Sequence, residues 1–484
     1  MNIELRRISI ATLAMFLALF VSTSVIQVFA VDDLRADPRN VRTLYASYSA
    51  ERGPILLAGT PIAESVAVDS VFEFLRIYPE PELYAPVTGY FTLNQGNTGI
   101  EGAFNDFLTG TANEQFLDQL GALVTGQNPR GAAVQLTLDP VVQQAAFEAM
   151  GDLKGAVIAI EPATGRILAM VSTPSFDPNR LSSHSTQSVL AAYDELLADP
   201  NDPLINRTIS GNLYFPGSTF KILVAAAAFD SGAFVPDDVF PNPPQLQLPL
   251  STRTISNSGG GTCGGGETVT IETALRLSCN IPFAQLGLAL GQDTIDEYAT
   301  AFGFGTAFEV PMPARPSTYP QDMDDAQLML SSFGQYDTRV TPLQMALISA
   351  TIANGGNLMQ PTLLDRIIAP DLSIVQQPEP VLVSQPITRT TAETMTRLMV
   401  DGVSNGVASN ARIGGVDVAG KTGTAENGGD RPYTLWFTGF APADNPQVAI
   451  AVVVEDGGGR GQSGSGNQIA APIAKRVIEA VLSR

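Results

Sequence analysis

The sequence is poor in the side chains from which most hydrolases and metalloproteins build their reactive centres. It has one histidine (His184), two cysteines (Cys263 and Cys279) and four lysines among its 27 basic residues. This shortage excludes a zinc site made of histidines and cysteines, and it leaves no Ser-His-Asp triad elsewhere in the chain. Any general base must therefore be a Lys, Asp, Glu or Tyr side chain.

Positive charge is also scarce, because 27 basic residues face 48 acidic residues and the formal net charge is −21. This balance argues against nucleic acid as the main partner, since phosphate contacts need clustered lysines and arginines. The apolar fraction of 44% is too high for a disordered chain. A length of 484 residues allows about two or three domains, each with its own core.

A long uncharged stretch follows Arg6 and Arg7 near the start of the chain. It covers residues 8–31, which is 24 residues, and about 20 apolar residues span the hydrocarbon core of a bilayer. We expect a retained membrane anchor, because the run is longer than the apolar segment of a signal peptide. A cleaved signal is the alternative, since Val28-Phe29-Ala30 fits a cleavage pattern. Basic residues stay inside, so in either case the body of the protein is extracytoplasmic.

The rest of the sequence changes character at about residue 130. Residues 32–130 mix short apolar runs with many turn residues, and they predict an irregular, strand-containing module without a catalytic constellation. Further on, the sequence predicts strands at 134–138, 155–160, 166–171, 434–440 and 448–454. It predicts helices at 140–150, 218–229, 271–277, 342–352 and 471–482. Strands near both ends with helices between them predict an antiparallel sheet packed against helices, an α+β domain.

The pattern with the clearest chemistry is Ser218-Thr-Phe-Lys221, which follows Pro216-Gly217 and opens an apolar helix. Residues i and i+3 share a helix face, so the Lys221 amine can reach the Ser218 hydroxyl. A serine hydroxyl is a weak nucleophile until a base takes its proton, and a lysine made neutral by burial can be that base. The helix N-terminus also offers free N–H groups to a developing oxyanion. Taken alone, the pattern also fits a surface serine beside a solvated lysine.

A second pattern, Lys421-Thr422-Gly423-Thr424, predicts a strand with polar residues at alternate positions. A glycine in a strand often marks the close approach of a ligand, and a cation with hydroxyls beside it suits a substrate carboxylate. A solvated edge strand is the alternative.

A third pattern, Ser278-Cys279-Asn280, is weak by itself. It follows the helix predicted at 271–277, where a turn would expose Ser278 and Asn280. The same pattern is typical of a helix C-cap, and Ser-x-Asn also begins at Ser210 and Ser465.

Together and in this order, the three patterns form the set found in penicillin-binding proteins and class A β-lactamases. Over roughly 350 residues the chain resembles the monofunctional (class B) penicillin-binding transpeptidases. The resemblance is carried by residues 155–179, 203–221, 334–335, 341–344 and 419–426. Residues 52–55, 59–60 and 99–101 are similar to the family's non-catalytic pedestal, and Ser-Cys-Asn with a second cysteine upstream is similar to the actinobacterial penicillin-binding protein A type.

The resemblance implies a division of the chain into three parts. Residues 1–31 would hold a cytoplasmic tip and a transmembrane anchor, and 32–130 a small strand-rich pedestal of the dimerisation type. Residues 131–484 would form an α+β transpeptidase domain of the penicillin-binding and serine β-lactamase-like fold, with an antiparallel sheet flanked by helices.

The resemblance also implies roles for the motif residues. Ser218 would attack the carbonyl between the two terminal D-alanines of a peptidoglycan stem peptide, Lys221 would take its proton, and Ser278 would relay a proton to the leaving D-alanine. Asn280 would hold the substrate amide, and the backbone N–H groups of Ser218 and Thr424 would form the oxyanion hole. The terminal carboxylate would bind to the last motif, Lys421, Thr422, Gly423 and Thr424. An amine from a neighbouring strand would then attack the acyl-enzyme, and β-lactams would stall at the acyl stage.

No metal or organic cofactor is implied. The implied partners are stem peptides and their lipid-linked precursor, β-lactams, a polytopic membrane glycosyltransferase and proteins of cell division or elongation, with no nucleic acid. The implied location is the cell membrane, with a single pass and an extracytoplasmic catalytic domain. Three alternatives remain at this point: a D,D-carboxypeptidase, a serine β-lactamase or β-lactam sensor, and an inactive scaffold of the division machinery.

Cys263 and Cys279 are expected to form a disulfide, because the compartment permits it. Closing a loop of about 15 residues is worth about 3 kcal/mol in the chain-entropy account. The bridge would also steady Ser278 and Asn280. Two buried free thiols are the alternative.

Overall fold

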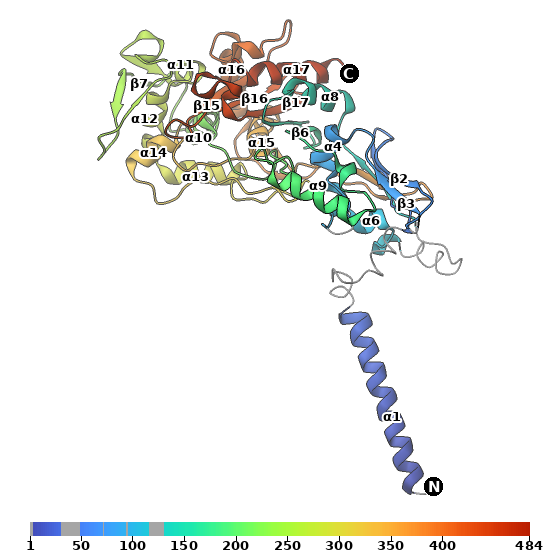
Figure 1. The fold of residues 1–484 in the computed structure, drawn as a ribbon. Helices are drawn as coiled ribbons and strands as arrows, with labels where there is room; N and C mark the ends of the chain where they lie inside the picture. The colour runs from blue at the N-terminus through green and yellow to red at the C-terminus, as the bar shows by residue number, and fades with distance from the viewer. Residues whose placement is uncertain (1–2, 31–48, 71, 93–94, 116–129) are drawn as a thin grey trace.

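The computed structural model describes residues 3–30, 49–70, 72–92, 95–115 and 130–484 (Figure 1). The predicted border between anchor and pedestal, at residues 31 and 32, lies outside the described residues. So do the parts of the predicted 32–130 module that fall between these ranges.

The N-terminal apolar run forms a helix that stands apart from the folded body in Figure 1. This helix, α1, covers Ile3–Ser24 and is continued by a π-helical turn over Val25–Phe29. The span Ile3–Gln27 has a mean hydropathy of 2.1 and none of it is buried. The length and composition of α1 are compatible with a single-pass membrane anchor.

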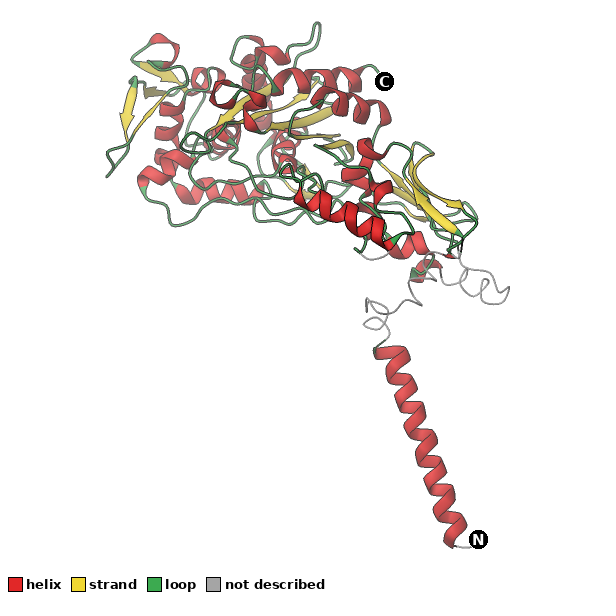
Figure 2. Ribbon diagram, in the orientation of Figure 1, coloured by secondary structure: helices red, strands yellow, loops and turns green. Residues whose placement is uncertain are grey.

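A five-stranded antiparallel sheet forms the centre of the larger part of the molecule (Figure 2). In spatial order its strands are β15 (Ala419–Ala425), β16 (Thr434–Ala441), β17 (Val448–Val454), β5 (Gly155–Ile160) and β6 (Ile167–Thr173). The two predicted hairpins and the predicted antiparallel sheet are confirmed. All five strands are almost fully buried, so helices must cover both faces.

Side chains on β17 alternate between two cores, as the two-residue period of a strand requires. Ala449, Ala451 and Val453 belong to the core that contains α15 (Pro342–Ala353), which packs against one face of the sheet. The intervening residues of β17 belong to the core formed with α8 (Pro140–Met150) and α17 (Ala470–Leu482). The structure therefore has helices on both faces, and it confirms the predicted α+β class.

A helical region packs beside this sheet and carries two of the three motifs. Its helices are α10 (Lys221–Asp230), α11 (Ile271–Arg276), α12 (Asn280–Leu290), α13 (Gln292–Ala301), α14 (Asp325–Ser331) and α16 (Arg389–Ser404). Helix α16 contacts β15, α11 and α10, and so joins the helical region to the edge of the sheet. This part of the chain also contains short two-stranded antiparallel sheets: β7 (Val239–Pro241) with β10 (Thr268–Thr270), the hairpin of β8 (Gln245–Gln247) with β9 (Thr254–Ser256), and β11 (Leu358–Met359) with β14 (Leu382–Ser384).

A second sheet joins segments that are far apart in the sequence. Its order is β13-β12-β4-β1-β2-β3, and β4 pairs parallel with β1 and antiparallel with β12. The strands are β1 (Ile55–Leu57), β2 (Thr60–Ala67), β3 (Phe74–Ile77), β4 (Ala133–Leu136), β12 (Leu364–Ile368) and β13 (Ile374–Gln376). Helices α4 (Pro81–Thr88), α5 (Gly99–Ala103), α6 (Asn105–Thr109) and α9 (Thr186–Ala198) lie near it.

A buried ion network, which the sequence analysis did not identify, holds the N-terminal part of this region together. Glu101 is fully buried, and its two carboxylate oxygens lie 2.6 Å from Arg52 Nε and 2.6 Å from Arg76 Nε. The Tyr78 hydroxyl donates to the same carboxylate at 3.2 Å. Burial opposes the charge on Glu101, but Arg76 and Arg52 outweigh burial and bring the pKa of this carboxyl below its ordinary value of 4.5.

Replacing Glu101 with glutamine is expected to destabilise the protein by about 3–5 kcal/mol, because two buried arginines lose their counter-charge. Thermal and denaturant unfolding of the full chain in detergent measures this loss. A lowered pKa also means that the wild type keeps this stabilisation above the ordinary pKa and loses it as the pH falls toward the lowered one. The exposed Glu80 provides the matched Glu→Gln control. Equal stability of the two variants would contradict the prediction.

Candidate active site

The three sequence motifs converge on one groove of about 1010 Å³. Ser218 lies on the short 3₁₀ turn Gly217–Thr219 before α10, and Ser278 lies between α11 and α12. Six of the predicted site residues line the groove: Ser218, Ser278, Asn280, Thr422, Gly423 and Thr424. The two motif lysines, Lys221 and Lys421, are buried with exposed fractions of 0% and 2%.

The turn that carries Ser218 is shaped by two glycines. The sequence predicted one helix over 218–229, but the structure has a 3₁₀ turn followed by α10 from Lys221. Gly217 has a φ of +54°, and its N–H donates to the Gly334 carbonyl at 2.9 Å. A Cβ on Gly334 would lie only 2.1 Å from the Gly217 carbonyl oxygen, so the two segments can approach only with glycine there. Ser218 is left half-buried on the groove wall.

A carboxylate at the end of β17 supports the segment that leads into this turn. Glu455 Oε1 accepts hydrogen bonds from Tyr214 Oη at 2.7 Å and from Arg207 Nε at 3.1 Å. Burial and then the charge of Glu455 raise the pKa of Tyr214 well above its ordinary value. Trp436 Nε1 donates to the Phe215 carbonyl at 3.0 Å. Trp436 is fully buried in the sheet core, and Glu455 was not predicted from the sequence, because no local pattern marks this residue.

Lys221 lies in a setting that favours its neutral form. Its amine donates to the Ser278 carbonyl and to Asn280 Oδ1, both at 2.8 Å. Burial and then the nearby amine of Lys421 lower the pKa of Lys221 well below its ordinary value of 10.5. A neutral amine has two N–H groups and one lone pair. Two acceptors use the two N–H groups, so the lone pair is left to take a proton from a third group.

Lys421 is paired with the hydroxyl of Ser278. Its amine donates to Ser278 Oγ at 2.7 Å and to the Thr422 carbonyl at 2.9 Å. Burial lowers the pKa of Lys421 to about 7. The family resemblance implied that Ser278 relays a proton to the leaving D-alanine. The structure presents its carbonyl to Lys221 and its hydroxyl to Lys421, so Ser278 contacts both lysines.

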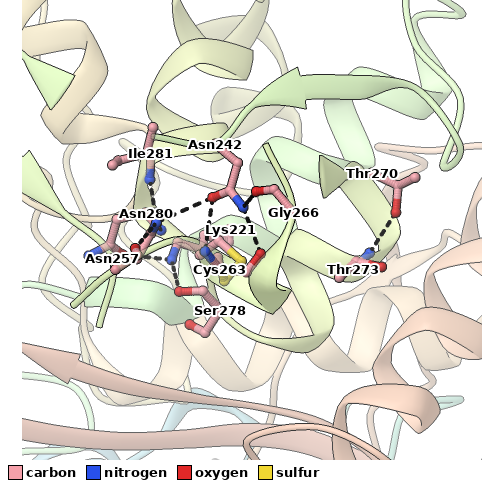
Figure 3. Close-up of a disulfide and its surroundings, with 12 residues drawn as sticks. Lys221, Asn242, Asn257, Cys263, Gly266, Thr270, Thr273, Ser278, Asn280 and Ile281 are labelled. Carbon is pink, nitrogen blue, oxygen red and sulfur yellow. Dashed lines mark hydrogen bonds between the residues drawn. A yellow bond between two sulfur atoms is a disulfide. The ribbon is translucent and has the colours of Figure 1, made fainter. Parts of the chain in front are cut away.

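A disulfide joins Cys263 to Cys279 and anchors the middle motif (Figure 3). Ser278 has a φ of +62°, a conformation that a serine keeps only when its surroundings hold it. Asn257 Oδ1 accepts from the N–H groups of Asn280 at 2.9 Å and Ile281 at 3.1 Å. The bridge and this cap therefore fix both sides of the motif.

Asn242 ties the disulfide loop to the same cap. Its amide nitrogen donates to the Cys263 carbonyl at 2.7 Å and to the Gly266 carbonyl at 2.9 Å, and its oxygen accepts from the Cys263 N–H at 3.0 Å (Figure 3). The amide nitrogen of Asn257 also lies 3.4 Å from this oxygen. The sequence analysis missed Asn242 and Asn257, since isolated asparagines carry no distinctive local signal.

Hydrogen bonds to Thr424, near the end of β15, and to Glu426, just after it, hold the opposite end of the groove. With its amide oriented to match, Gln335 donates to the Glu426 carbonyl at 3.2 Å and accepts from the Glu426 N–H at 3.1 Å. The Gly466 N–H donates to Thr424 Oγ1 at 3.3 Å. Ser465 and Asn467, one of the other two Ser-x-Asn pairs in the sequence, also line the groove.

Family comparisons agree with this geometry. Residues 155–479, more than half of the chain, match the model described as the penicillin binding protein transpeptidase domain. Residues 52–134 match the model described as the penicillin binding protein A dimerisation domain.

Relatives that match over the whole length of the chain indicate the same family. The chain is 44% identical to peptidoglycan D,D-transpeptidase PbpA of Mycolicibacterium smegmatis over 100% of this chain and 99% of that one. It is 43% identical, with the same coverage, to peptidoglycan D,D-transpeptidase PbpA of Mycobacterium tuberculosis. Penicillin-binding protein A of M. tuberculosis, solved as a ceftriaxone acyl-enzyme complex, superposes with a TM-score of 0.87 at 41% identity, covering 90% of this chain and 100% of that one. The chain therefore belongs to the penicillin-binding protein transpeptidase family, as a class B member of the penicillin-binding protein A type.

Proposed function

We propose that Ser218 is the nucleophile with which this chain, as a peptidoglycan D,D-transpeptidase, cross-links stem peptides. The observation that carries the proposal is the position of Ser218 on the groove wall, three residues before a fully buried amine whose two N–H groups are already used. Such an amine is a competent general base, because burial keeps it neutral. Penicillin-binding protein A of M. tuberculosis, which shares this fold, forms acyl-enzymes with ceftriaxone, imipenem and penicillin G.

The acylation step follows from this arrangement. Ser218 Oγ attacks the carbonyl of the bond between the two terminal D-alanines, and its proton passes to Lys221 Nζ. The C–N bond breaks, and the terminal D-alanine leaves as an amine after taking a proton through the Ser278 hydroxyl. This hydroxyl accepts a hydrogen bond from Lys421, and the Ser278 carbonyl accepts one from Lys221. The backbone N–H groups of Ser218 and Thr424 bind the oxyanion. An acceptor amine then attacks the ester carbonyl and gives a proton to Lys221 Nζ. The C–O bond to Ser218 breaks, Ser218 Oγ takes that proton back, and the new amide is the cross-link.

Substrate binding is assigned to β15 and Asn280. β15 is an edge strand of the central sheet, so backbone groups on its outer side can pair with an extended peptide. The Thr422 and Thr424 hydroxyls line the groove and would bind the terminal carboxylate, with the Lys421 amine buried behind them. Asn280 lines the groove beside Ser278 and would hold the substrate amide.

The location and the partners are part of the same proposal. The helix α1 anchors the chain in the cell membrane by a single pass, and Arg6 and Arg7 near its start support an extracytoplasmic catalytic domain. The protein then acts in wall growth or division. It takes lipid-linked precursor or nascent strands supplied by a polytopic membrane glycosyltransferase, together with proteins of division or elongation.

A synthetic stem peptide ending in D-Ala-D-Ala, incubated with the full-length protein and an amine acceptor, tests the reaction. We expect D-alanine release together with an acceptor adduct whose share rises with acceptor concentration, because the acceptor amine and water compete for the same acyl-enzyme. Mass spectrometry separates this adduct from the hydrolysed peptide. Hydrolysis alone at saturating acceptor would indicate a carboxypeptidase, and no release at all would indicate an inactive scaffold.

A further inference from the structure

The groove differs in charge from the molecule that contains it. The chain carries a net charge of −21. Of the described residues that line the groove, three are charged: Arg253, Arg431 and Glu426. The groove is thus a locally cationic surface on a strongly acidic protein. Such a surface concentrates anionic ligands and steers them to the site.

Arg431 is held at a defined place by the hairpin that joins β15 to β16. Gln462 Nε2 donates to the carbonyls of Gly429 at 2.8 Å and Arg431 at 3.1 Å. Asn427 Nδ2 donates to the Pro432 carbonyl at 2.6 Å, across the same turn. Both sides of the turn are therefore fixed, and the side chain of Arg431 starts from an ordered backbone.

The guanidinium of Arg431 is exposed, and a backbone carbonyl orients it. Its Nε donates to the Gly428 carbonyl at 3.2 Å. Within the part of the chain that the structure describes, no carboxylate forms an ion pair with it, although Glu426 and Asp430 are on the same hairpin and exposed. A guanidinium held by Nε still presents Nη1 and Nη2, and this pair suits a carboxylate.

The order of residues along β15 shows which part of a substrate would meet Arg431. If the terminal carboxylate binds at Thr422, the attacked carbonyl lies nearer the Ser218 turn, where Gly217 packs against Ala425. The rest of the donor peptide then extends past Ala425 toward the hairpin that carries Arg431. Arg431 is therefore on the side of the donor peptide, upstream of the scissile bond.

We propose that Arg431 binds a free carboxylate of the donor stem peptide, upstream of the bond attacked by Ser218, and so selects donors that carry a carboxylate there over donors that carry a carboxamide. Arg253, on the β8–β9 hairpin, also lines the groove and adds to its positive electrostatic potential, but we do not assign this contact to it. The inference rests on the proposed function of Ser218 and goes beyond it by naming the chemistry of the donor.

Two penicillins provide a matched test with the full-length protein in detergent. Carbenicillin is penicillin G with one added carboxylate on its acyl side chain, upstream of the reactive carbonyl. We expect Arg431→Gln to lower the ratio of acylation rate constants, carbenicillin over penicillin G, about three- to five-fold, the size typical of one exposed charge pair. Arg431→Lys should restore part of the ratio, and Arg431→Glu should lower it further. Higher ionic strength should lower the wild-type ratio more than the Arg431→Gln ratio.

Arg460→Gln is the control, because Arg460 is exposed and is not among the described lining residues of the groove, yet the substitution removes the same charge. Its ratio should equal that of the wild type. The proposal is overturned if Arg431→Gln leaves the ratio of acylation rate constants unchanged, or if Arg460→Gln lowers this ratio equally. Either result leaves the assignment of the acyl-enzyme to Ser218 unaffected. A wild type that neither penicillin acylates overturns the proposed function itself. Donor peptides with a free or an amidated upstream carboxylate should show the same preference in kcat/KM.

Discussion

Replacing Ser218 with alanine is expected to abolish covalent labelling of the chain by fluorescent penicillin, because the oxygen that carries the acyl group is removed. The groove itself should survive the change. Ser218 is half-buried, and the turn is held by backbone contacts of Gly217 and by the Thr219 hydroxyl, which donates to the Pro216 carbonyl at 2.7 Å. Gel fluorescence after incubation of the full-length protein measures the loss.

A control variant separates this effect from general damage. Ser188→Ala removes an exposed serine hydroxyl on α9, away from the groove, and should label like the wild type. The thermal unfolding temperatures of both variants should stay near that of the wild type, which shows that the lost label is chemical in origin. A label that persists in Ser218→Ala, mapped by mass spectrometry to another residue, would remove Ser218 from its assigned role.

Replacing Lys221 with methionine is expected to reduce the acylation rate constant by about 10²–10⁴, the usual contribution of a positioned general base. Lys221→Arg should reduce the acylation rate constant as well, because the guanidinium stays protonated and cannot accept the proton of Ser218. Stopped-flow or time-resolved labelling with a penicillin gives the rate constant. Near wild-type acylation by Lys221→Met would show that another group takes the proton of Ser218.

The pH dependence of acylation tests the coupling between the two buried lysines. Lys221 must be neutral to act, so the rate should rise with pH through its lowered pKa. The pKa of Lys421 is about 7, so below that pH Lys421 is increasingly protonated and its charge opposes protonation of Lys221. Lys421→Met removes this opposing charge and raises the pKa of Lys221. The acidic limb of the rate profile should therefore move to higher pH, even where the maximal rate also falls.

The matched control for this profile is Lys475→Met, since Lys475 is on the surface helix α17 and its amine faces Glu479. Its acidic limb should coincide with that of the wild type between about pH 5 and about pH 9. If the acidic limb of the rate profile lies at the same pH in Lys421→Met as in the wild type, burial alone sets the pKa of Lys221.

Much of the central sheet could be predicted because its signals are local. The runs 155–160 and 166–171 are apolar and separated by turn residues, and the structure forms β5 and β6 there with only small shifts at the ends. The same holds for β16, β17, α8 and α15. Each of these elements is bounded by residues next to it in sequence, so a single stretch contains the information that defines it.

The second sheet could not be predicted in this way. β4 pairs with β12, and Leu136 lies opposite Leu364, more than 200 positions later in the chain. The strand predicted at 134–138 overlaps β4 (Ala133–Leu136), but its sequence does not indicate which strands it pairs with, because the partners are chosen by packing in three dimensions. The buried contacts of Glu101 with Arg52 and Arg76 are of the same kind, since nothing local indicates that these charges are buried together.

For the site, the residue types and their order along the chain already indicated a serine nucleophile, a lysine base and a cationic strand motif, because short-range spacing places Ser218 and Lys221 one helical turn apart. Folding alone established that Ser278 presents its carbonyl to one lysine and its hydroxyl to the other, and that Glu455 supports the turn of the nucleophile. The physical reason is that hydrogen-bond direction and burial depend on all the neighbours of an atom in space. For these side chains the neighbours come from segments that are 57 to 241 residues apart in the sequence.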